Sequence, residues 1–280
     1  MPDVTKPINS RPEIARSIVT GDFTTNYHDV GSGDTVVLLH GSGPGVTAWA
    51  NWNKTFPLLG GSFRLLAPDM AGFGFTQRVP DAVYSMNNWV HQVVDFFDAI
   101  GIEKAHLVGN SFGGALALAM AIKHPERVNK LVLMGAMGVS FPITYGLDRV
   151  WGYEPSLANM EELLEIFTYD HSFATPDLIK SRYEGSIQPG FHESFSAMFP
   201  PPRQNSVDRM AANQAYIRDI QHPTLIIHGL QDRVIPVANS YQLLNLIPNA
   251  QLHIFGKCGH WTQIEHTAEF CELLRVFFES

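Results

Sequence analysis

The sequence predicts an α/β protein built around a mainly parallel sheet. Short apolar runs rich in β-branched residues alternate with helix-forming stretches from the first third of the 280-residue chain to its end. Several of these runs stop at a loop that contains glycine, as strands do before a crossover helix. With 45% hydrophobic residues, the chain is long enough to bury one large core and to carry a cap.

The first predicted elements form a hairpin. Residues 16–20 and 23–30 are strand-like and flank the turn dipeptide Gly21-Asp22. The residues before them are polar and interrupted by prolines, so we expect no secretory leader. No apolar run reaches the length of a membrane span, and we expect a cytoplasmic protein that binds no membrane.

The next strand, predicted over residues 35–39, runs into the glycine-rich loop 40–45. Such a loop leaves backbone N–H groups free at the carboxyl end of a strand. The amide of Ser42 is therefore predicted to be one donor of an oxyanion hole. A phosphate-binding loop is the competing interpretation, but its Lys-Ser/Thr ending is missing and Pro44 interrupts any helix start.

The segment LVGNSFGG, residues 107–114, has the pattern of a nucleophile elbow. Residues 105–108 are strand-like, and residues 115–123 favour a helix. The glycines let strand and helix pass closely, so that Ser111 stands at the tip of a strained turn as the predicted nucleophile. The amide of Phe112 is the predicted second oxyanion donor. An ordinary glycine-rich turn before a helix is the alternative.

The alternation stops after residues 131–134, and few strand-like runs follow until residue 209. We therefore predict a helical lid over residues 138–206, inserted between two parts of the core, residues 1–137 and 207–280. Several apolar lid residues either line the substrate cavity or hold the lid together: Phe141, Ile143, Trp151, Phe173, Met198 and Phe199.

An acid is needed to orient the base that activates Ser111. Residues 224–229 form another predicted strand, and Asp232 lies in the loop at its carboxyl end. Asp219 precedes the same strand and falls at the opposite edge of the sheet. Asp232 is the predicted acid, although a turn or N-cap role is the ordinary fate of a loop aspartate.

The base must follow Asp232 if the order is serine, acid, histidine. Three of the 12 histidines qualify, namely His253, His260 and His266. His253 alternates within a strand and His266 begins the last helix. His260 lies in a loop just beyond the strand, at the edge where open α/β sheets form their sites. We predict that Asp232 fixes the tautomer of His260, which takes the proton from Ser111.

Beyond this triad, longer strings make the chain resemble the meta-cleavage product hydrolases of the α/β-hydrolase superfamily. The matching strings are HGSGPGVTAWANW at 40–52, GNSFGG at 109–114, CGHW at 258–261, and the lid segments GVSFPIT at 138–144 and GFHESF at 190–195. The resemblance implies an α/β-hydrolase fold, with a mostly parallel eight-stranded sheet flanked by helices and an inserted helical lid. The lid strings are similar to the branch that acts on 2-hydroxymuconic semialdehyde and its alkyl ketone relatives.

The implied reaction is serine-dependent hydrolysis of a carbon–carbon bond in 2-hydroxymuconic semialdehyde or a 6-alkyl 2-hydroxy-6-oxohexa-2,4-dienoate. Its products would be 2-hydroxypenta-2,4-dienoate and a carboxylic acid. The resemblance also implies substrate-binding residues: Gly41, Gly43, Asn51, Asn110, Arg182 and Trp261. The plainer alternatives are a surface Arg182 paired with Glu184 or another lid acid, and asparagines that satisfy the loop backbone.

The formal charge of −8, from 19 basic and 27 acidic residues, argues against a nucleic-acid partner. A carboxylated substrate therefore needs local cations and amides. The two cysteines predict neither a disulfide framework nor a metal cluster, and no cofactor is expected. We expect a homo-oligomer, a dimer or tetramer. A serine esterase or lactonase of the same fold, or a triad-bearing ligand receptor, remains the alternative function.

Overall fold

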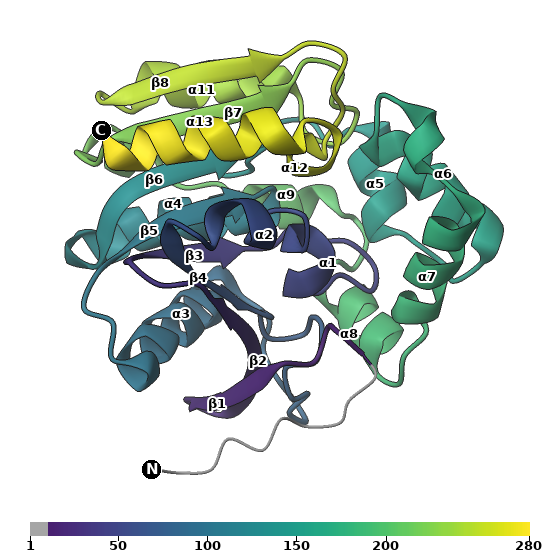
Figure 1. The fold of residues 1–280 in the computed structure, drawn as a ribbon. Coiled ribbons are helices and arrows are strands. Elements are labelled where there is room, and N and C mark those ends of the chain that lie inside the picture. The colour runs from purple at the N-terminus through teal and green to yellow at the C-terminus, as the bar shows by residue number, and fades with distance from the viewer. Residues whose placement is uncertain (1–10) are drawn as a thin grey trace.

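A computed structural model describes residues 11–280 and contains one eight-stranded sheet in the order β1-β2-β4-β3-β5-β6-β7-β8 (Figure 1). Residues 1–10, where the predicted core segment 1–137 begins, lie outside the described residues. The strands are β1 (Arg16–Thr20), β2 (Phe23–Val30), β3 (Asp34–Leu39), β4 (Phe63–Pro68), β5 (Ala105–Asn110), β6 (Val128–Met134), β7 (Thr224–Gly229) and β8 (Ala250–Phe255). The eight-stranded α/β-hydrolase architecture is as predicted.

Strand pairing confirms the predicted hairpin and the predicted parallel sheet. β1 and β2 pair antiparallel, with Arg16 opposite Tyr27, and β2 pairs antiparallel with β4. From β4 through β3 to β8 every neighbouring pair is parallel. Because these strands share one direction, the loops after β3, β5, β7 and β8 all emerge at the same edge of the sheet.

Helices cover both faces of the sheet, so its inner strands bury side chains on each side. In β3, Val37 and Leu39 join the core beneath one layer of helices, and Val36 and Leu38 join the core beneath the other. The first layer contains α3 (Met86–Ile100), α4 (Phe112–Lys123) and α11 (Val237–Leu246). The second contains α1 (Ala48–Trp52), α2 (Phe56–Leu59) and α13 (Thr267–Glu279), which lies in front of the sheet in Figure 1.

Three glycines allow α4 to pass very close to the sheet. A Cβ added at Gly109 would lie 2.1 Å from the carbonyl oxygen of Gly113. A Cβ at Gly113 would lie 2.3 Å from the carbonyl oxygen of Leu39, and one at Gly114 would lie 2.5 Å from the Cβ of Ala136. Real Cβ atoms do not approach other heavy atoms this closely, so the turn between β5 and α4 requires glycine at each position.

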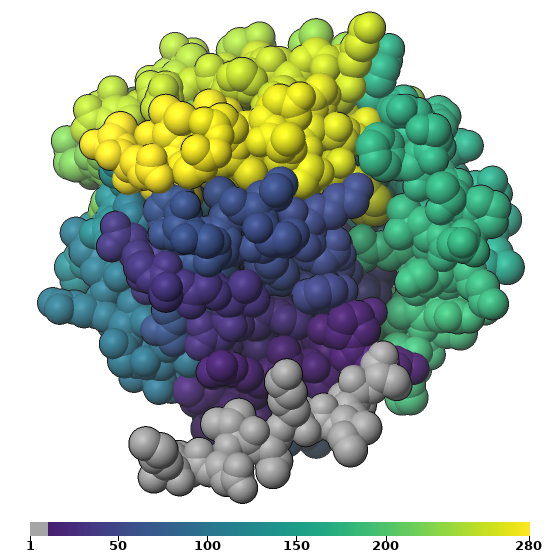
Figure 2. Space-filling model, in the orientation of Figure 1, coloured from purple at the N-terminus to yellow at the C-terminus, as the bar shows by residue number. Residues whose placement is uncertain are grey.

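The segment between β6 and β7 is helical and covers the carboxyl-end edge of the sheet (Figure 1). It contains α5 (Tyr145–Trp151), α6 (Leu157–Phe167), α7 (Pro176–Ser186), α8 (Phe191–Met198), α9 (Gln204–Met210) and α10 (Gln214–Arg218). Figure 2 shows its teal and green surface packed beside both the purple and the yellow parts of the core. The predicted lid boundary at 206 falls inside α9, so the division into core and lid remains a prediction.

The remaining elements are the one-turn helix α12 (Thr262–Glu265) and two 3-10 helices, Pro125–Arg127 and His171–Phe173. Throughout residues 11–280, no helix is both long enough and apolar enough to cross a lipid bilayer.

We expect Gly113→Ala to destabilise the fold by about 1–3 kcal/mol, because the new methyl group forces α4 away from β3. Activity should fall at least about tenfold, since Ser111 moves with the helix. Urea denaturation and turnover measure the two effects. The matched control is Gly185→Ala in α7, where the nearest atom would lie 3.6 Å from the new Cβ. Equal stability of the two variants would contradict the steric argument.

Candidate active site

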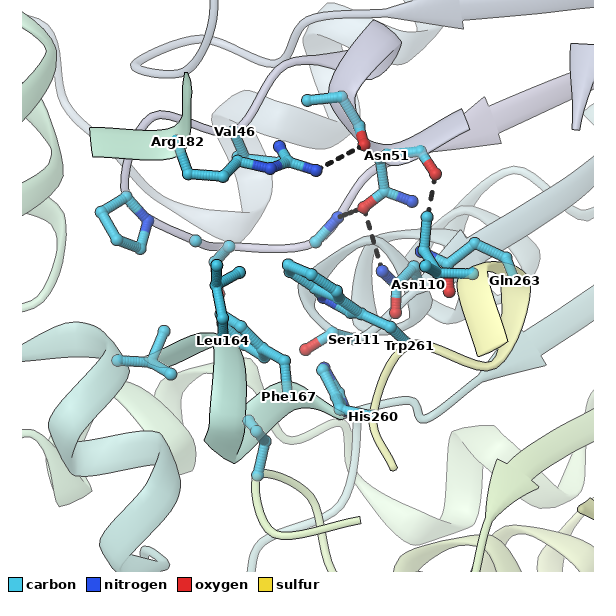
Figure 3. A pocket seen from close by; sticks show the side chains of 18 of the residues that line it. Val46, Asn51, Asn110, Ser111, Leu164, Phe167, Arg182, His260, Trp261 and Gln263 are labelled. Atoms are coloured by element: carbon cyan, nitrogen blue, oxygen red, sulfur yellow. Dashed lines mark hydrogen bonds between the residues drawn. The ribbon is translucent and has the colours of Figure 1, made fainter. Parts of the chain in front are cut away.

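Ser111 stands in a strained turn between β5 and α4. Its φ of 56° and ψ of −112° lie in a region that L-residues rarely adopt. Its N–H donates to the carbonyl oxygen of Met134 at 2.9 Å, and its own carbonyl oxygen accepts from Gly114 and Met137. The backbone on both sides therefore holds the strained conformation, and the side chain lines a pocket at the carboxyl-end edge of the sheet (Figure 3).

Two backbone amides beside Ser111 have the character of oxyanion-hole donors. Neither the N–H of Ser42 nor that of Phe112 donates to any acceptor within residues 11–280. Phe112 is the first residue of α4, where a helix leaves its N–H groups unpaired. The centroid of its ring lies 4.7 Å from that of Trp89 and 5.4 Å from that of Phe73, so the ring is anchored in the core. The amide is thus held on a rigid element, as a preorganised donor must be.

His40, a residue that the sequence analysis did not single out, supports the loop of Ser42. Its Nε2 accepts from the N–H of Met70 at 2.9 Å, and its Nδ1 lies 2.8 Å from the carbonyl oxygen of Gly41. This pattern requires a neutral ring with its proton on Nδ1. Burial lowers the pKa of His40 to about 4, which keeps that tautomer at neutral pH.

Asp232 and His260 form the predicted pair, although 28 residues separate them. The Nδ1 of His260 lies 2.7 Å from Oδ2 of Asp232, and both side chains are almost completely buried. Gly135, after β6, leaves space for this pair, because a Cβ there would lie 3.2 Å from the His260 ring. His260 lines the same pocket as Ser111 (Figure 3). The structure therefore brings all three predicted triad residues to one edge of the sheet.

The Asp232 carboxylate has more polar contacts than its position in a loop suggested. Its Oδ1 accepts from the N–H groups of Val234 at 2.7 Å and Ile235 at 2.9 Å. Its Oδ2 also lies 3.2 Å from Nε2 of His228, which is fully buried on β7. Burial alone raises the pKa of this carboxyl, but the attraction of His260 and His228 outweighs burial and holds the pKa below its ordinary range. Asp232 is thus ionised at neutral pH.

The pocket has an apolar half lined by side chains from α5, α6 and the loop after β7, namely Leu147, Val150, Met160, Leu164, Phe167 and Val234. None of the six apolar lid residues considered from the sequence is among its lining residues. Trp151 instead stacks on Phe199 at 4.4 Å and donates from its indole N–H to the hydroxyl of Ser42. The cavity-lining role was wrong for these residues, because five of them pack into the core cluster and Phe173 lies half-exposed beneath Lys54.

The opposite half of the pocket is polar (Figure 3). The Oδ1 of Asn51 accepts from the N–H of Gly41 at 3.2 Å and from Nδ2 of Asn110 at 3.0 Å. Asn51 therefore satisfies loop backbone, as the plainer interpretation held, yet it also lines the pocket together with Asn110, Gly41 and Gly43. The buried Nδ2 of Asn51 and Oδ1 of Asn110 have no hydrogen-bond partner among the described residues.

Arg182 is a partly buried cation at the polar end of this pocket. Its Nη2 donates to the carbonyl oxygen of Ala50 at 2.8 Å, and its guanidinium lies 5.4 Å from the centre of the Trp261 ring. No carboxylate within residues 11–280 forms an ion pair with it; Glu184 lies 3.9 Å from Lys180 instead. Burial lowers the pKa of Arg182 to about 10, so it is still charged at neutral pH. The surface-pair alternative is wrong.

The helical segment between β6 and β7 packs directly against the base. The carbonyl oxygen of Phe167, the last residue of α6, accepts from the N–H of His260 at 2.7 Å. The Phe167 ring stacks on Trp261 at 4.6 Å and lies 6.0 Å from the His260 ring. These contacts shield the His260–Asp232 pair from water.

Across residues 11–280, no three His, Cys, Asp or Glu side chains gather into a group that could hold a metal ion. Cys258 and Cys271 are both free thiols in the core. Burial raises the pKa of the Cys258 thiol far above its ordinary value, so it is a poor nucleophile although it lies near His260.

Comparison with known proteins identifies the family. A family model described as the alpha/beta hydrolase fold matches residues 34–267. A 2-hydroxymuconate semialdehyde hydrolase of Pseudomonas sp. (strain CF600) is 56% identical over 271 residues, which is 97% of this chain and 95% of that protein. The 2-hydroxy-6-oxo-2,4-heptadienoate hydrolase of Pseudomonas putida is 53% identical over 269 residues, 96% of this chain and 98% of that protein. The chain belongs to the meta-cleavage product hydrolases.

A solved structure of a relative agrees with the geometry of this hydrolase. The meta-cleavage product hydrolase of Pseudomonas fluorescens, in a serine-to-alanine variant complexed with acetates, is 54% identical and superimposes with a TM-score of 0.95. The match covers 95% of this chain and 98% of that one. The hydrolase therefore shares with this relative the entire sheet and the helical segment above it.

The buried His40 predicts a pH dependence of the stability of the hydrolase. Its folded pKa of about 4 lies below the unfolded value, so its stabilising contribution is complete above about pH 6.5 and is lost as the pH falls toward 4. The wild-type enzyme should therefore lose unfolding free energy between pH 6.5 and pH 4. We expect His40→Gln, which keeps an acceptor near Met70, to lose about 3 kcal/mol less over the same interval. Urea denaturation at several pH values measures the unfolding free energy of both proteins, and an equal loss in both would contradict the prediction.

Proposed function

We propose that this hydrolase cleaves the C5–C6 bond of a 2-hydroxy-6-oxohexa-2,4-dienoate, with hydrogen or a small alkyl group on C6. Water is consumed, and the products are 2-hydroxypenta-2,4-dienoate and a small carboxylic acid. The substrates in the names of the two relatives above, at 56% and 53% identity, support this class. The observation that carries the proposal is Arg182, a partly buried cation that lines the pocket and forms no ion pair with a carboxylate in the described chain.

The pocket suits the two ends of such a substrate. The C1 carboxylate lies against Arg182 and the free Nδ2 of Asn51, which together supply charge and a donor. Trp261, which also faces Arg182, packs beside the flat dienoate. The substituent on C6 lies in the apolar half formed by the lid. A carboxylated substrate therefore gains binding energy that a simple ester does not.

In the proposed mechanism, the dienol first becomes a ketone, with His260 moving the proton to C5. The hydroxyl of Ser111 then loses its proton to His260 and attacks C6, while the N–H groups of Ser42 and Phe112 stabilise the oxyanion. The C5–C6 electron pair leaves as a dienolate, which is delocalised into the C2 carbonyl group and takes up a proton. Water, activated by His260, hydrolyses the acyl-serine and releases the carboxylic acid.

Asp232 keeps His260 in the required tautomer and stabilises its cationic form.

We further propose that the enzyme acts in the cytoplasm as a homo-oligomer. An esterase or lactonase would use the same triad, and the polar half of the pocket is what favours the dienoate over a neutral ester.

We expect the wild-type enzyme to bleach the yellow dienolate of 2-hydroxymuconic semialdehyde and its 6-methyl and 6-ethyl analogues, and Ser111→Ala to lose this activity by at least about 10³-fold. Absorbance during turnover measures both. Far slower bleaching of the 6-phenyl analogue would indicate that the apolar half of the pocket is too small for a phenyl group. Well-folded wild-type protein that leaves every dienolate coloured but hydrolyses aryl esters would reject the proposal in favour of an esterase.

The role of Arg182 is tested by Arg182→Met. Because a hydrogen bond to a charged group contributes about 1.5–3 kcal/mol, kcat/KM for the dienoate should fall about 10- to 150-fold. The effect on an aryl acetate, which has no carboxylate, should be much smaller. Arg149→Met is the matched lid control, since Arg149 pairs with Glu162 at the surface. If the activity on both substrates falls equally, Arg182 stabilises the helical segment over the pocket and does not bind the substrate carboxylate.

A further inference from the structure

Gln263 is a buried polar residue of the pocket to which neither the triad nor the carboxylate site assigns a role. It lies on α12, two residues after Trp261, and lines the pocket beside Asn110 (Figure 3). Its side chain is 1% exposed. Its Nε2 lies 3.5 Å from the carbonyl oxygen of Asn51, the limit of a hydrogen bond, and its Oε1 has no partner in the described residues.

The neighbouring amides do not explain this arrangement. The N–H of Gly41 sets the orientation of Asn51, and the contact with Asn51 in turn sets that of Asn110. Their hydrogen bonds hold both side chains in place without help from Gln263. An apolar side chain of similar length would fill the same volume without burying an unpaired acceptor, which costs folding free energy. The amide of Gln263 is therefore better explained by a ligand than by stability.

We propose that the amide of Gln263 binds the C2 oxygen of the dienoate. This inference rests on the proposed function, because the C2 oxygen lies next to the C1 carboxylate that Arg182 and Asn51 hold. The C2 hydroxyl is the only hydrogen-bond donor of the dienoate. The pocket offers it two buried acceptors without partners, Oε1 of Gln263 and Oδ1 of Asn110.

The C2 oxygen changes character during the reaction. It is a hydroxyl in the dienol, a negatively charged oxygen in the dienolate and a carbonyl oxygen in the ketone. The first requires an acceptor and the other two a donor. Nε2 of Gln263 carries two hydrogens, of which Asn51 engages one, so the amide presents an acceptor and a donor together. Asn110 also keeps one N–H and its Oδ1, but its hydrogen bond to Asn51 is 3.0 Å long, whereas the 3.5 Å contact of Gln263 holds that amide only weakly. Gln263 is therefore the amide that can turn toward the C2 oxygen.

The test compares the affinity of two ligands in a Ser111→Ala background, which prevents turnover. The ligands are 2-hydroxy-6-oxohepta-2,4-dienoate and its analogue without the C2 oxygen, and calorimetric titration measures each Kd. We expect the enzyme to prefer the 2-hydroxy compound by about tenfold, and Gln263→Met to abolish this preference while binding the analogue as before. Gln221→Met, at an exposed position before β7, is the matched control and should keep the preference.

Two further measurements separate binding from folding. Gln263→Met should leave Tm unchanged or raise it, because the variant no longer buries an unpaired acceptor. Gln263→Glu keeps an acceptor but removes the N–H donor, so its affinity for the 2-hydroxy ligand should fall further as rising pH converts the ligand to the dienolate. A preference that survives in Gln263→Met, or a variant that loses affinity for both ligands equally, would overturn the proposal. Failure of the proposed function itself would give a different result, because the Ser111→Ala variant would then bind neither ligand.

Discussion

The close passage of α4 over β5 and β3 is the constraint on which the catalytic arrangement depends. At Gly109 and Gly113 a Cβ would overlap backbone oxygen atoms, so the turn exists only with glycine there. The crossing holds Ser111 at a positive φ and leaves the N–H of Phe112 unpaired at the start of a buried helix. Nucleophile and oxyanion donor thus result from one steric feature, which the sheet core makes rigid.

Two charges of opposite sign, Asp232 fully buried and Arg182 partly buried, have different roles in the site. Asp232 accepts from two backbone N–H groups and lies against His260 and His228, so it is stabilised as an anion behind His260. Arg182 has one backbone acceptor and the face of Trp261, and therefore remains available to an anionic ligand. Burial costs free energy in both cases, but Asp232 recovers it from two backbone N–H groups and two histidines, whereas Arg182 forms no ion pair in the described chain. This difference separates a catalytic charge from a binding charge.

Much of the site could be predicted because its residues follow the ends of strands. Ser42, Ser111, Asp232 and His260 lie in loops after β3, β5, β7 and β8, and parallel strands bring such loops to one edge. The contribution of His228 could not be predicted in this way. It lies within β7, and its contact with Asp232 depends on the turn that brings residue 232 back over the strand. No local pattern distinguishes it from an ordinary buried histidine.

By itself, the sequence determined the alternation of strands and helices and the glycine-rich turn at Ser111, and it predicted the loops that carry Asp232 and His260, because strand runs, glycine positions and loop residues are local features. Only the tertiary structure decided which faces of the helices between β6 and β7 meet the pocket, that Arg182 is partly buried without an ion pair in the described chain, and that Gln263 presents an unpaired acceptor. These properties depend on distances between segments far apart in the chain, and helical periodicity alone does not specify which of several apolar faces packs inward.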